Sequence, residues 1–247
     1  MSDARKVTIR TQAAGWFARR RVDELMDAPE LPLDQHRHAL AGLRRINAAS
    51  GVANQLTREI VAWARRRNLS HVRLLDVACG GGDVPVNVAR SLASLGISID
   101  LTLVDRSPNA LKEAAELARV SKIKVVTQVA DATRAFPEDS FDIVTNTLFL
   151  HHLDEADVIT SLKDMKRAAR LLLVSDLRRS PLAWGFTWIG CRLVSRSSIV
   201  HFDGPVSVRG AWTIGEMKQM AMDAGLTGAT IRRQWPFRML LRWERDE

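Results

Sequence analysis

The chain has 247 residues, 46% of them hydrophobic, which is enough to bury the core of one sizeable globular domain. Its formal net charge of +8 comes from basic residues spread along the whole sequence, so we expect solvated surface groups and no nucleic-acid interface. Only two cysteines are present, and neither an apolar leader nor a membrane-spanning run is evident, which excludes a disulfide framework and predicts a cytoplasmic protein.

Residues 1–70 are predicted to form a helical cap, because apolar residues recur there at helical spacing. The expected helices are 11–26, 34–48 and 52–67. A simple packing role against the following domain is one interpretation. A second interpretation is a lid over a cofactor, for which Arg44, Asn47 and Ser50 would supply polar contacts.

From residue 71 onward, short β-branched runs alternate with amphipathic segments of helical length. Such alternation predicts parallel strands joined by right-handed helical crossovers, so residues 71–247 are expected to form an α/β domain. The expected strands are 73–78, 99–104, 124–129, 141–145 and 169–175. The expected helices are 84–95, 108–120 and 155–167.

Two later segments depart from this alternation. Residues 178–210 are rich in Trp, Ser, Gly and Arg with weak periodicity, which predicts an insertion. Residues 213–224 are expected to form a helix capped by Thr213. The tail, residues 227–243, contains two runs around a Trp-Pro pair and is predicted to form a closing antiparallel hairpin.

Residues 73–90 predict a ligand-binding elbow: a buried strand, a turn of three glycines and a helix. Glycine permits a close backbone approach or a positive φ, and the N-terminus of the helix offers unpaired N–H groups. Ligands of parallel sheets bind at the carboxyl ends of the strands. Asp105, Asp131 and Asn146 end or follow the next strands and are expected to share this site.

The elbow suits a cationic nucleoside better than a dinucleotide. The dinucleotide fingerprint needs Gly or Ala where this chain has Pro85. Asp76, at the end of the first strand, would repel a pyrophosphate but attract an ammonium group. We therefore expect a nucleoside that carries a positively charged amino-acid tail.

Four stretches in this order, Leu-Leu-Asp-Val-Ala-Cys-Gly-Gly-Gly-Asp, Leu-Val-Asp, Ala-Asp-Ala and Phe-Asp-Ile-Val-Thr-Asn-Thr-Leu-Phe-Leu-His-His-Leu, resemble motifs I to IV of class I S-adenosylmethionine-dependent methyltransferases. The resemblance extends from about residue 72 to the C-terminus. It implies a Rossmann-like, mostly parallel seven-stranded sheet in the order 3-2-1-4-5-7-6, with strand 7 antiparallel. S-adenosyl-L-methionine is the cofactor that it implies.

The resemblance also assigns the parts of the cofactor to residues of this chain. Asp76, Gly80 and Gly82 would hold the methionine part, Asp105 the ribose, Asp131 and Ala132 the adenine, and Asn146 with Thr147 the far side of the methionine. Ala78 and Arg106, which lie beside these positions, complete the candidate cofactor-binding set.

Methyl transfer to a hydroxyl group needs an aligned nucleophile and a base. His151, just past the fourth strand, is the first candidate base, and its neighbour His152 is a weaker one. His201 is the second candidate, with Asp203 placed to orient it. Each histidine has a purely structural alternative, as a helix cap, a packing residue or a loop hydrogen bond.

The methyl acceptor is expected to be a small molecule. The Asn/Asp-Pro-Pro-Tyr/Phe tetrad of base methyltransferases and the Pro-Cys nucleophile of RNA cytosine methyltransferases are absent, and acidic residues after the fourth strand are too few to predict a metal. Residues 39–47, 176–180 and 201–209 resemble bacterial methyltransferases encoded with type III polyketide synthases, which implies O-methylation of a phenolic or pyrone product. C-methylation of a quinone or lipid-like substrate, an RNA methyltransferase or RNA-binding role, and a monomer or a homodimer stay open.

Overall fold

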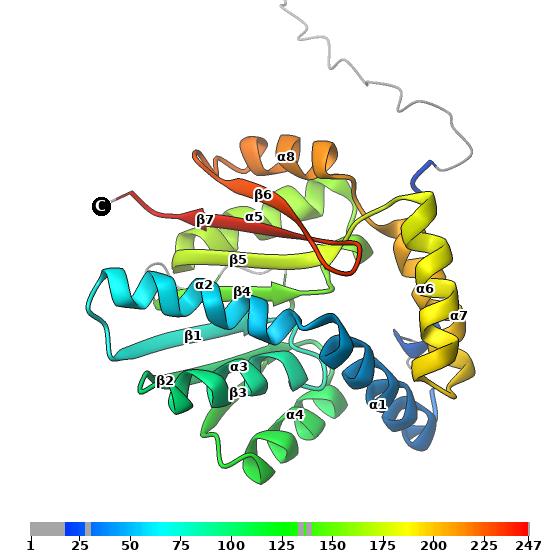
Figure 1. Ribbon diagram of the computed structural model, residues 1–247, viewed down its shortest axis with the longest axis horizontal. Coiled ribbons are helices and arrows are strands. Elements are labelled where there is room, and N and C mark those ends of the chain that lie inside the picture. The colour runs from blue at the N-terminus through cyan, green and yellow to red at the C-terminus, as the bar shows by residue number, and fades with distance from the viewer. Residues whose placement is uncertain (1–17, 28–30, 133–135, 137–139, 247) are drawn as a thin grey trace, which may run out of the picture.

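A seven-stranded sheet forms the centre of the computed structural model, which describes residues 18–27, 31–132, 136 and 140–246 (Figure 1). The strand order is β3-β2-β1-β4-β5-β7-β6, and β7 runs antiparallel to both of its neighbours. Both the Rossmann-like class and the strand order predicted from the sequence are confirmed.

The strands are β1 His71–Val77, β2 Ser98–Asp105, β3 Val125–Val129, β4 Phe141–Thr147, β5 Ala169–Leu177, β6 Thr230–Gln234 and β7 Arg238–Glu244. The α-helices are α1 Leu33–Ser50, α2 Val52–Arg66, α3 Asp83–Ser94, α4 Pro108–Val120, α5 Glu155–Ala168, α6 Pro181–Val194, α7 Ser198–Gly210 and α8 Ile214–Asp223. Two short 3-10 turns are η1 Leu25–Asp27 and η2 Leu150–His152.

Helices cover both faces of the sheet, and the core lies in the two layers between them. Successive residues of a strand point to opposite faces, so Leu74 joins the cluster under α2, α3 and α4, and Leu75 joins the one under α5 and α8. Trp63 of α2 and Met165 of α5 are fully buried in these two clusters. The near-continuous apolar runs of β1, β4 and β5 follow from this burial on both sides.

Three helices gather beyond the carboxyl ends of the parallel strands, where Figure 1 shows α1, α6 and α7 at the right of the sheet. α6 and α7 are the predicted insertion. They pack closely, since a Cβ atom on Gly204 would lie 2.4 Å from the Cys191 sulfur. α1 contacts both helices, so this end of the sheet is walled by segments distant in sequence.

The predicted helix over residues 11–26 is wrong in its described part, and residues 11–17 lie outside the described residues. Residues 18–24 form neither helix nor strand and lead into η1. We call residues 18–27 the N-terminal strap. Its backbone pairs with other elements instead of with itself: the N–H of Arg20 donates to Arg209 O, and those of Leu25 and Met26 donate to the Asp203 carboxylate. The expected helices at 34–48 and 52–67 are α1 and α2.

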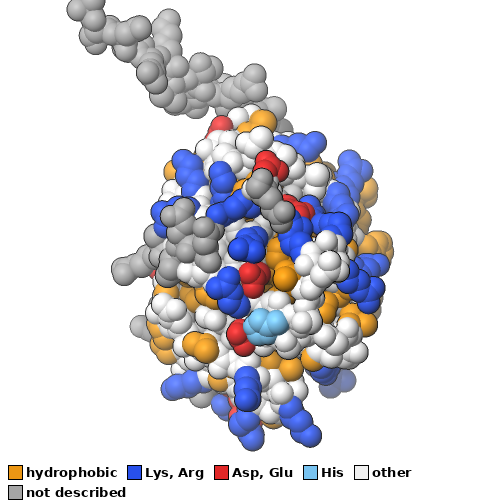
Figure 2. All heavy atoms as spheres, turned by 90° about the vertical axis from the view of Figure 1, so that its left-hand side faces the viewer, with side chains coloured by type: hydrophobic (Ala, Val, Ile, Leu, Met, Phe, Trp, Pro, Cys, Tyr) orange, Lys and Arg blue, Asp and Glu red, His pale blue; other side chains and the backbone are white. Residues whose placement is uncertain are grey.

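Charged side chains are dispersed on the face where the parallel strands begin, which Figure 2 shows with basic groups scattered over it. A shallow hollow there is lined by Arg67, Arg242 and Glu244, and both arginines form ion pairs with Glu244. None of the helices in the described ranges is long and apolar enough to cross a membrane.

Candidate active site

The elbow between β1 and α3 is a turn whose backbone only glycine accepts at one position. Gly82 has φ +71°, and a Cβ atom there would lie 2.7 Å from the Cβ of Ala114 on α4. Gly80 has φ +52°, and a Cβ atom there would meet no other atom within 4 Å, so its outer side is open. Gly82 therefore serves packing and conformation, while Gly80 leaves room for a ligand beside the turn.

Asp105, at the end of β2, holds the elbow in shape. Its two carboxylate oxygens accept hydrogen bonds of 2.8 Å, one from the N–H of Gly80 and one from the N–H of Ser107. Each oxygen keeps a further lone pair, so the carboxylate can accept from a ribose hydroxyl as well. Asp105 thus fixes the turn and keeps acceptor capacity that a ribose could use.

Three carboxylates converge at the start of the elbow. Asp76 is buried, and its Oδ2 accepts a 2.6 Å hydrogen bond from the hydroxyl of Thr145. Burial raises the pKa of Asp76 to about 7; the bond from Thr145 lowers it, and the charges of Asp83 and Asp105 raise it further. A positively charged ligand would relieve this crowding of negative charge, so the elbow is electrostatically suited to a cation.

Unpaired polar atoms line the end of the neighbouring strand β4. Asn146 donates to the carbonyl of Val77 at 2.8 Å, but its Oδ1 and the hydroxyl of Thr147 are buried without a hydrogen-bond partner among the described residues. Buried polar atoms are seldom left unpaired, so these two fit a site that a polar ligand completes. The residues of the predicted cofactor set on β1, β2 and β4 thus meet at one edge of the sheet.

The remaining members of that set lie at the margin of the same edge. Asp131 is exposed just after β3, and Ala132 beside it is buried. Ala78 adopts φ +55° directly after β1, and Arg106 is exposed next to Asp105. Their assignment to adenine and to the rim of the site stays a prediction.

α1 lies over the glycine turn. A Cβ atom on Gly81 would lie 3.6 Å from the Arg44 guanidinium, and Asn47 donates a 3.1 Å hydrogen bond to Asp83. Ser50, in contrast, donates to the carbonyl of Asn47 in its own helix. Two of the three polar residues proposed for a lid are therefore in contact with the elbow.

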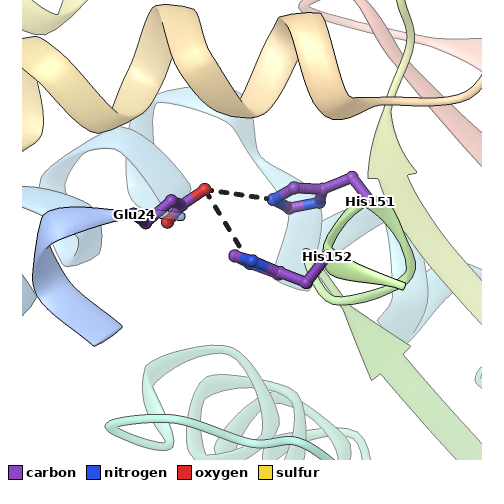
Figure 3. A group of neighbouring side chains, drawn as sticks. All are labelled: Glu24, His151 and His152. Atoms are coloured by element: carbon purple, nitrogen blue, oxygen red, sulfur yellow. Dashed lines mark ion pairs between the residues drawn. The ribbon is translucent and has the colours of Figure 1, made fainter. Parts of the chain in front are cut away.

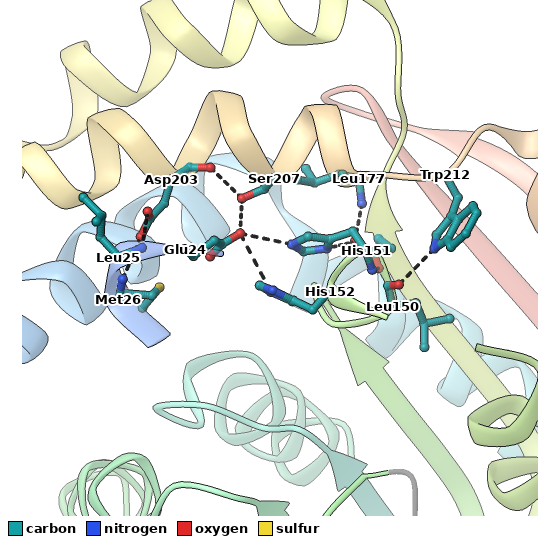
Figure 4. A network of polar contacts seen from close by, with 12 residues as sticks. Glu24, Leu25, Met26, Leu150, His151, His152, Leu177, Asp203, Ser207 and Trp212 are labelled. Carbon is teal, nitrogen blue, oxygen red and sulfur yellow. Dashed lines mark hydrogen bonds and ion pairs between the residues drawn. The ribbon is translucent and has the colours of Figure 1, made fainter. Parts of the chain in front are cut away.

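A second group of polar residues surrounds His151, where η2 follows β4. His151 is buried, and its Nδ1 lies 2.7 Å from Oδ1 of Asp176 at the end of β5. Its Nε2 faces Glu24 of the strap at 3.4 Å (Figure 3). Figure 4 shows Ser207 of α7 donating to the same Glu24 carboxylate. The imidazole is thus held between two carboxylates from different elements.

The two carboxylates determine the charge of His151. Burial alone would lower its pKa, but Asp176 and then Glu24 raise the pKa to about 10. The pKa values of Asp176 and Glu24 are lowered despite their burial, because each accepts from the imidazole. His151 is therefore a cation at neutral pH while Glu24 is in contact.

His152 is less tightly held than His151. Its ring lies 4.1 Å from the ring of His151, and its Nε2 is 3.8 Å from Glu24. One ring nitrogen of each histidine and one Glu24 oxygen lie within 4.8 Å of one another, a set of donors that a transition metal accepts. The expectation that the protein uses no metal stays a prediction.

The structure does not join His201 to this group. Its Nε2 bonds to the carbonyl of Ser195 at 2.7 Å, within the α6–α7 connection. Asp203, expected to orient it, instead accepts from the backbone of Leu25 and Met26. An Asp203–His201 pair is therefore absent, and each residue has a structural partner.

Two residues of the site carry no local signal in the sequence. Glu24 lies in the wrongly predicted helix, and Arg238 in β7 is buried while donating a 2.8 Å hydrogen bond to Asn47. Each pairs with a residue more than a hundred positions away. β7 also holds Arg242 and Glu244, so nothing in the sequence singles out Arg238 as the buried charge.

Known proteins resemble this chain in the part that carries the elbow. A family model described as a methyltransferase domain matches residues 74–170. A ubiquinone biosynthesis O-methyltransferase of Xanthomonas euvesicatoria is 31% identical over 53% of this chain and 54% of its own length. One of Xanthomonas campestris is 29% identical over 69% of this chain. The chain spans 62% of that second relative, so it covers only part of the length of each.

Solved structures share the fold at low sequence identity. A Nostoc punctiforme protein whose name proposes an O-methyltransferase superposes with a TM-score of 0.62 at 19% identity, over 92% of this chain and 64% of that one. The magnesium protoporphyrin IX methyltransferase of Synechocystis, with bound SAH, gives 0.54 at 17% identity over 81% of this chain and 87% of its own. Residues 74–170 thus match a methyltransferase domain, and the strand order is that of the Rossmann-like methyltransferase fold.

Proposed function

We propose that this protein transfers the methyl group of S-adenosylmethionine to a hydroxyl of a small phenolic or polyketide-type acceptor. The observation that carries the proposal is the buried His151–Asp176 pair at the carboxyl edge of the sheet, next to the elbow. The relatives named ubiquinone biosynthesis O-methyltransferases support a hydroxyl as the acceptor group.

Bound cofactor would supply an electrophilic methyl group on a sulfonium, with Asp76, Asp105 and Asn146 as its holding residues. The chain's own task is then to align the acceptor and remove its proton. Asp176 fixes the tautomer of His151 by accepting from Nδ1, which leaves Nε2 to take the proton. An acceptor hydroxyl reaches Nε2 by replacing Glu24 as its partner.

An imidazole base favours an acidic acceptor. A phenolic hydroxyl, with an ordinary pKa of about 10, gives up its proton to such a base far more readily than an aliphatic alcohol does. An aliphatic alcohol is a far weaker acid and would gain little from this base.

The first test is binding of S-adenosylhomocysteine by calorimetry, followed by methyl transfer from radiolabelled S-adenosylmethionine to a panel of phenols, catechols and hydroxypyrones. Product NMR assigns the methyl group to oxygen or to carbon. We expect His151→Asn to lose about 100-fold or more in kcat. His201→Asn, whose side chain bonds to Ser195, is the matched control and should keep kcat within about threefold.

If NMR finds the new methyl group on a carbon of the product and none on oxygen, C-methylation replaces the proposed O-methylation. Equal losses in the two histidine variants would contradict the role given to His151. An absence of cofactor binding at millimolar concentration would reject the methyltransferase proposal as a whole.

A further inference from the structure

The outer face of α6 is the most apolar exposed surface in the described part of the chain. Leu182 and Leu193 are 76% and 80% exposed, and Ile189 between them is 54% exposed. Trp184, Phe186 and Trp188 add aromatic surface on the same helix. Scattered exposed apolar residues are normal, but six on one short helix form a patch that requires a partner.

Helical spacing gathers four of these residues on one side, while Trp184 and Trp188 form a second row with Arg192 on the neighbouring flank. Leu182, Phe186, Ile189 and Leu193 are separated by four, three and four positions, which places them in one stripe along the helix. Cys191 lies on the opposite side, is buried, and faces Gly204 of α7. Phe186 also touches Trp235, an exposed residue of the β6–β7 turn that extends the patch.

The charge around this patch has one sign. Residues 177–202 contain four arginines and no acidic residue; the side chain of one of the arginines, Arg179, is buried in an ion pair with Glu216 and does not add to the charge around the patch. Arg192 lies over the Trp188 ring at 3.9 Å, and Arg196 is exposed just beyond the helix. Asp176 and Asp203, the acidic residues on either side of this segment in the sequence, are buried and already accept hydrogen bonds. The patch is therefore apolar and aromatic with a basic rim.

We propose that the outer face of α6 docks on an anionic phospholipid bilayer, with the helix lying in the plane of the headgroups. Tryptophan prefers that depth, leucine and isoleucine bury their side chains below it, and arginine pairs with anionic headgroups. A second copy of the chain is the competing occupant, which the oligomeric state in solution distinguishes. α6 packs on α7, so docking would hold the Glu24–His151 end of the molecule near the membrane surface.

Vesicle flotation of the full chain tests the proposal. We expect binding to vesicles of equal phosphatidylcholine and phosphatidylglycerol at about 100 mM NaCl, and at least tenfold weaker binding to pure phosphatidylcholine. Leu182→Ser with Leu193→Ser should weaken partition into the mixed vesicles by about tenfold or more. Arg192→Gln with Arg196→Gln should also weaken binding to the anionic vesicles by about tenfold, and should leave binding to pure phosphatidylcholine unchanged.

The matched control is Val120→Ser with Met222→Ser, two residues 66% and 63% exposed on other helices, which should bind as the parent does. Folding of every variant is checked by its melting temperature and by S-adenosylhomocysteine binding. Equal vesicle binding by the leucine and control variants, or no binding by the parent chain, overturns the proposal. So does light scattering that shows a dimer which the leucine substitutions dissolve, since α6 would then be covered by a second copy.

Discussion

At the scale of single residues, Gly80 and Gly82 of the elbow differ in what an added side chain would disturb. At Gly80 it would disturb only the backbone conformation, and at Gly82 both the conformation and the packing. Gly82→Ala should destabilise the protein by about 3 kcal/mol, because it combines a left-handed backbone with a clash against Ala114. Gly80→Ala should cost about 1 kcal/mol, since only the backbone conformation is affected. Urea denaturation measures both values.

Adding Ala114→Gly to the Gly82→Ala variant removes the atom that the new Cβ meets at 2.7 Å. The double variant should be less destabilised than the sum of the two single changes. Additive losses would show that Ala114 does not restrict residue 82.

Asp76 links cofactor affinity to pH. Its pKa of about 7 is above the ordinary value, so the carboxyl is neutral below that pH and ionised above it. A cationic ligand prefers the ionised form, and its affinity should therefore fall about tenfold per pH unit below 7. Calorimetry with S-adenosylmethionine between about pH 5.5 and 8 measures the slope. Asp76→Asn should bind more weakly with a flatter profile, and an unchanged slope would remove Asp76 from the site.

The Glu24 carboxylate sets the pH at which His151 works as a base. Since the raised pKa keeps His151 protonated up to about pH 10, methyl transfer should rise with pH toward that value. Glu24→Gln removes a negative neighbour and lowers the pKa, so its rate should reach its own plateau at lower pH. The pH profile of His151→Asn provides the baseline, because the rate of a variant without this base depends only on the ionisation of the acceptor hydroxyl. Superimposable profiles for Glu24→Gln and the parent would show that Glu24 does not act on the base.

The grouping of candidate site residues was predictable where these residues are close together in the sequence. Asp76, Gly80 and Gly82 stand next to one another along the chain and keep that proximity in the fold. Glu24 could not be found in this way, because its contact with His151 depends on a strap that crosses to another element. The pairing expected between His201 and Asp203 failed for the converse reason: residues two positions apart on a helix do not face each other.

At the scale of elements, the N-terminal strap depends on one arginine. Arg19 donates to the carbonyls of His151, Leu153 and Gly210, and its guanidinium lies 3.6 Å from the centre of the Trp212 ring. Arg19→Ala should therefore cost about 2 kcal/mol of stability, because these carbonyls lose a charged donor. Arg21→Ala is the control, with an exposed ion pair and an expected loss below about 0.5 kcal/mol.

Chemical denaturation of both variants, together with kcat, tests the strap. A loss of kcat in Arg19→Ala larger than in Arg21→Ala is expected, because the strap carries Glu24 to His151. Equal stability of the two variants would mean that the strap is held by its backbone contacts alone.

A helix or strand was predictable from the sequence when its buried residues differ clearly in polarity from the exposed residues or turns around them. β1, β4 and β5 are buried on both sides and bounded by turns, so their apolar runs were recognisable. α6 was not, because its exposed side is as apolar as its buried side and the helical period disappears. α7 carries Gly204 and Pro205 in its interior, residues that sequence rules associate with turns.

At the scale of the whole molecule, Arg238 connects the two halves of the site. It comes from β7 near the end of the chain, bonds to Asn47 of α1, and lies in the field of Asp83 at the elbow and Asp176 beside His151. Burial lowers its pKa to about 10 while these two carboxylates raise it, so the guanidinium stays charged at neutral pH. The elbow and the group around His151 thus share one buried cation.

Removing this cation should destabilise the fold more than removing an exposed one from the same strand. Arg238→Met is expected to cost about 3 kcal/mol in urea denaturation, because Asp83 and Asp176 lose their compensating charge. Arg242→Met, whose ion pairs with Glu59 and Glu244 are partly exposed, should cost below about 1 kcal/mol. Combining Arg238→Met with Asn47→Leu should cost about 1 kcal/mol less than the sum, since both changes break the same hydrogen bond. Strict additivity, or equal losses at Arg238 and Arg242, would show that the two sides of the site are held independently.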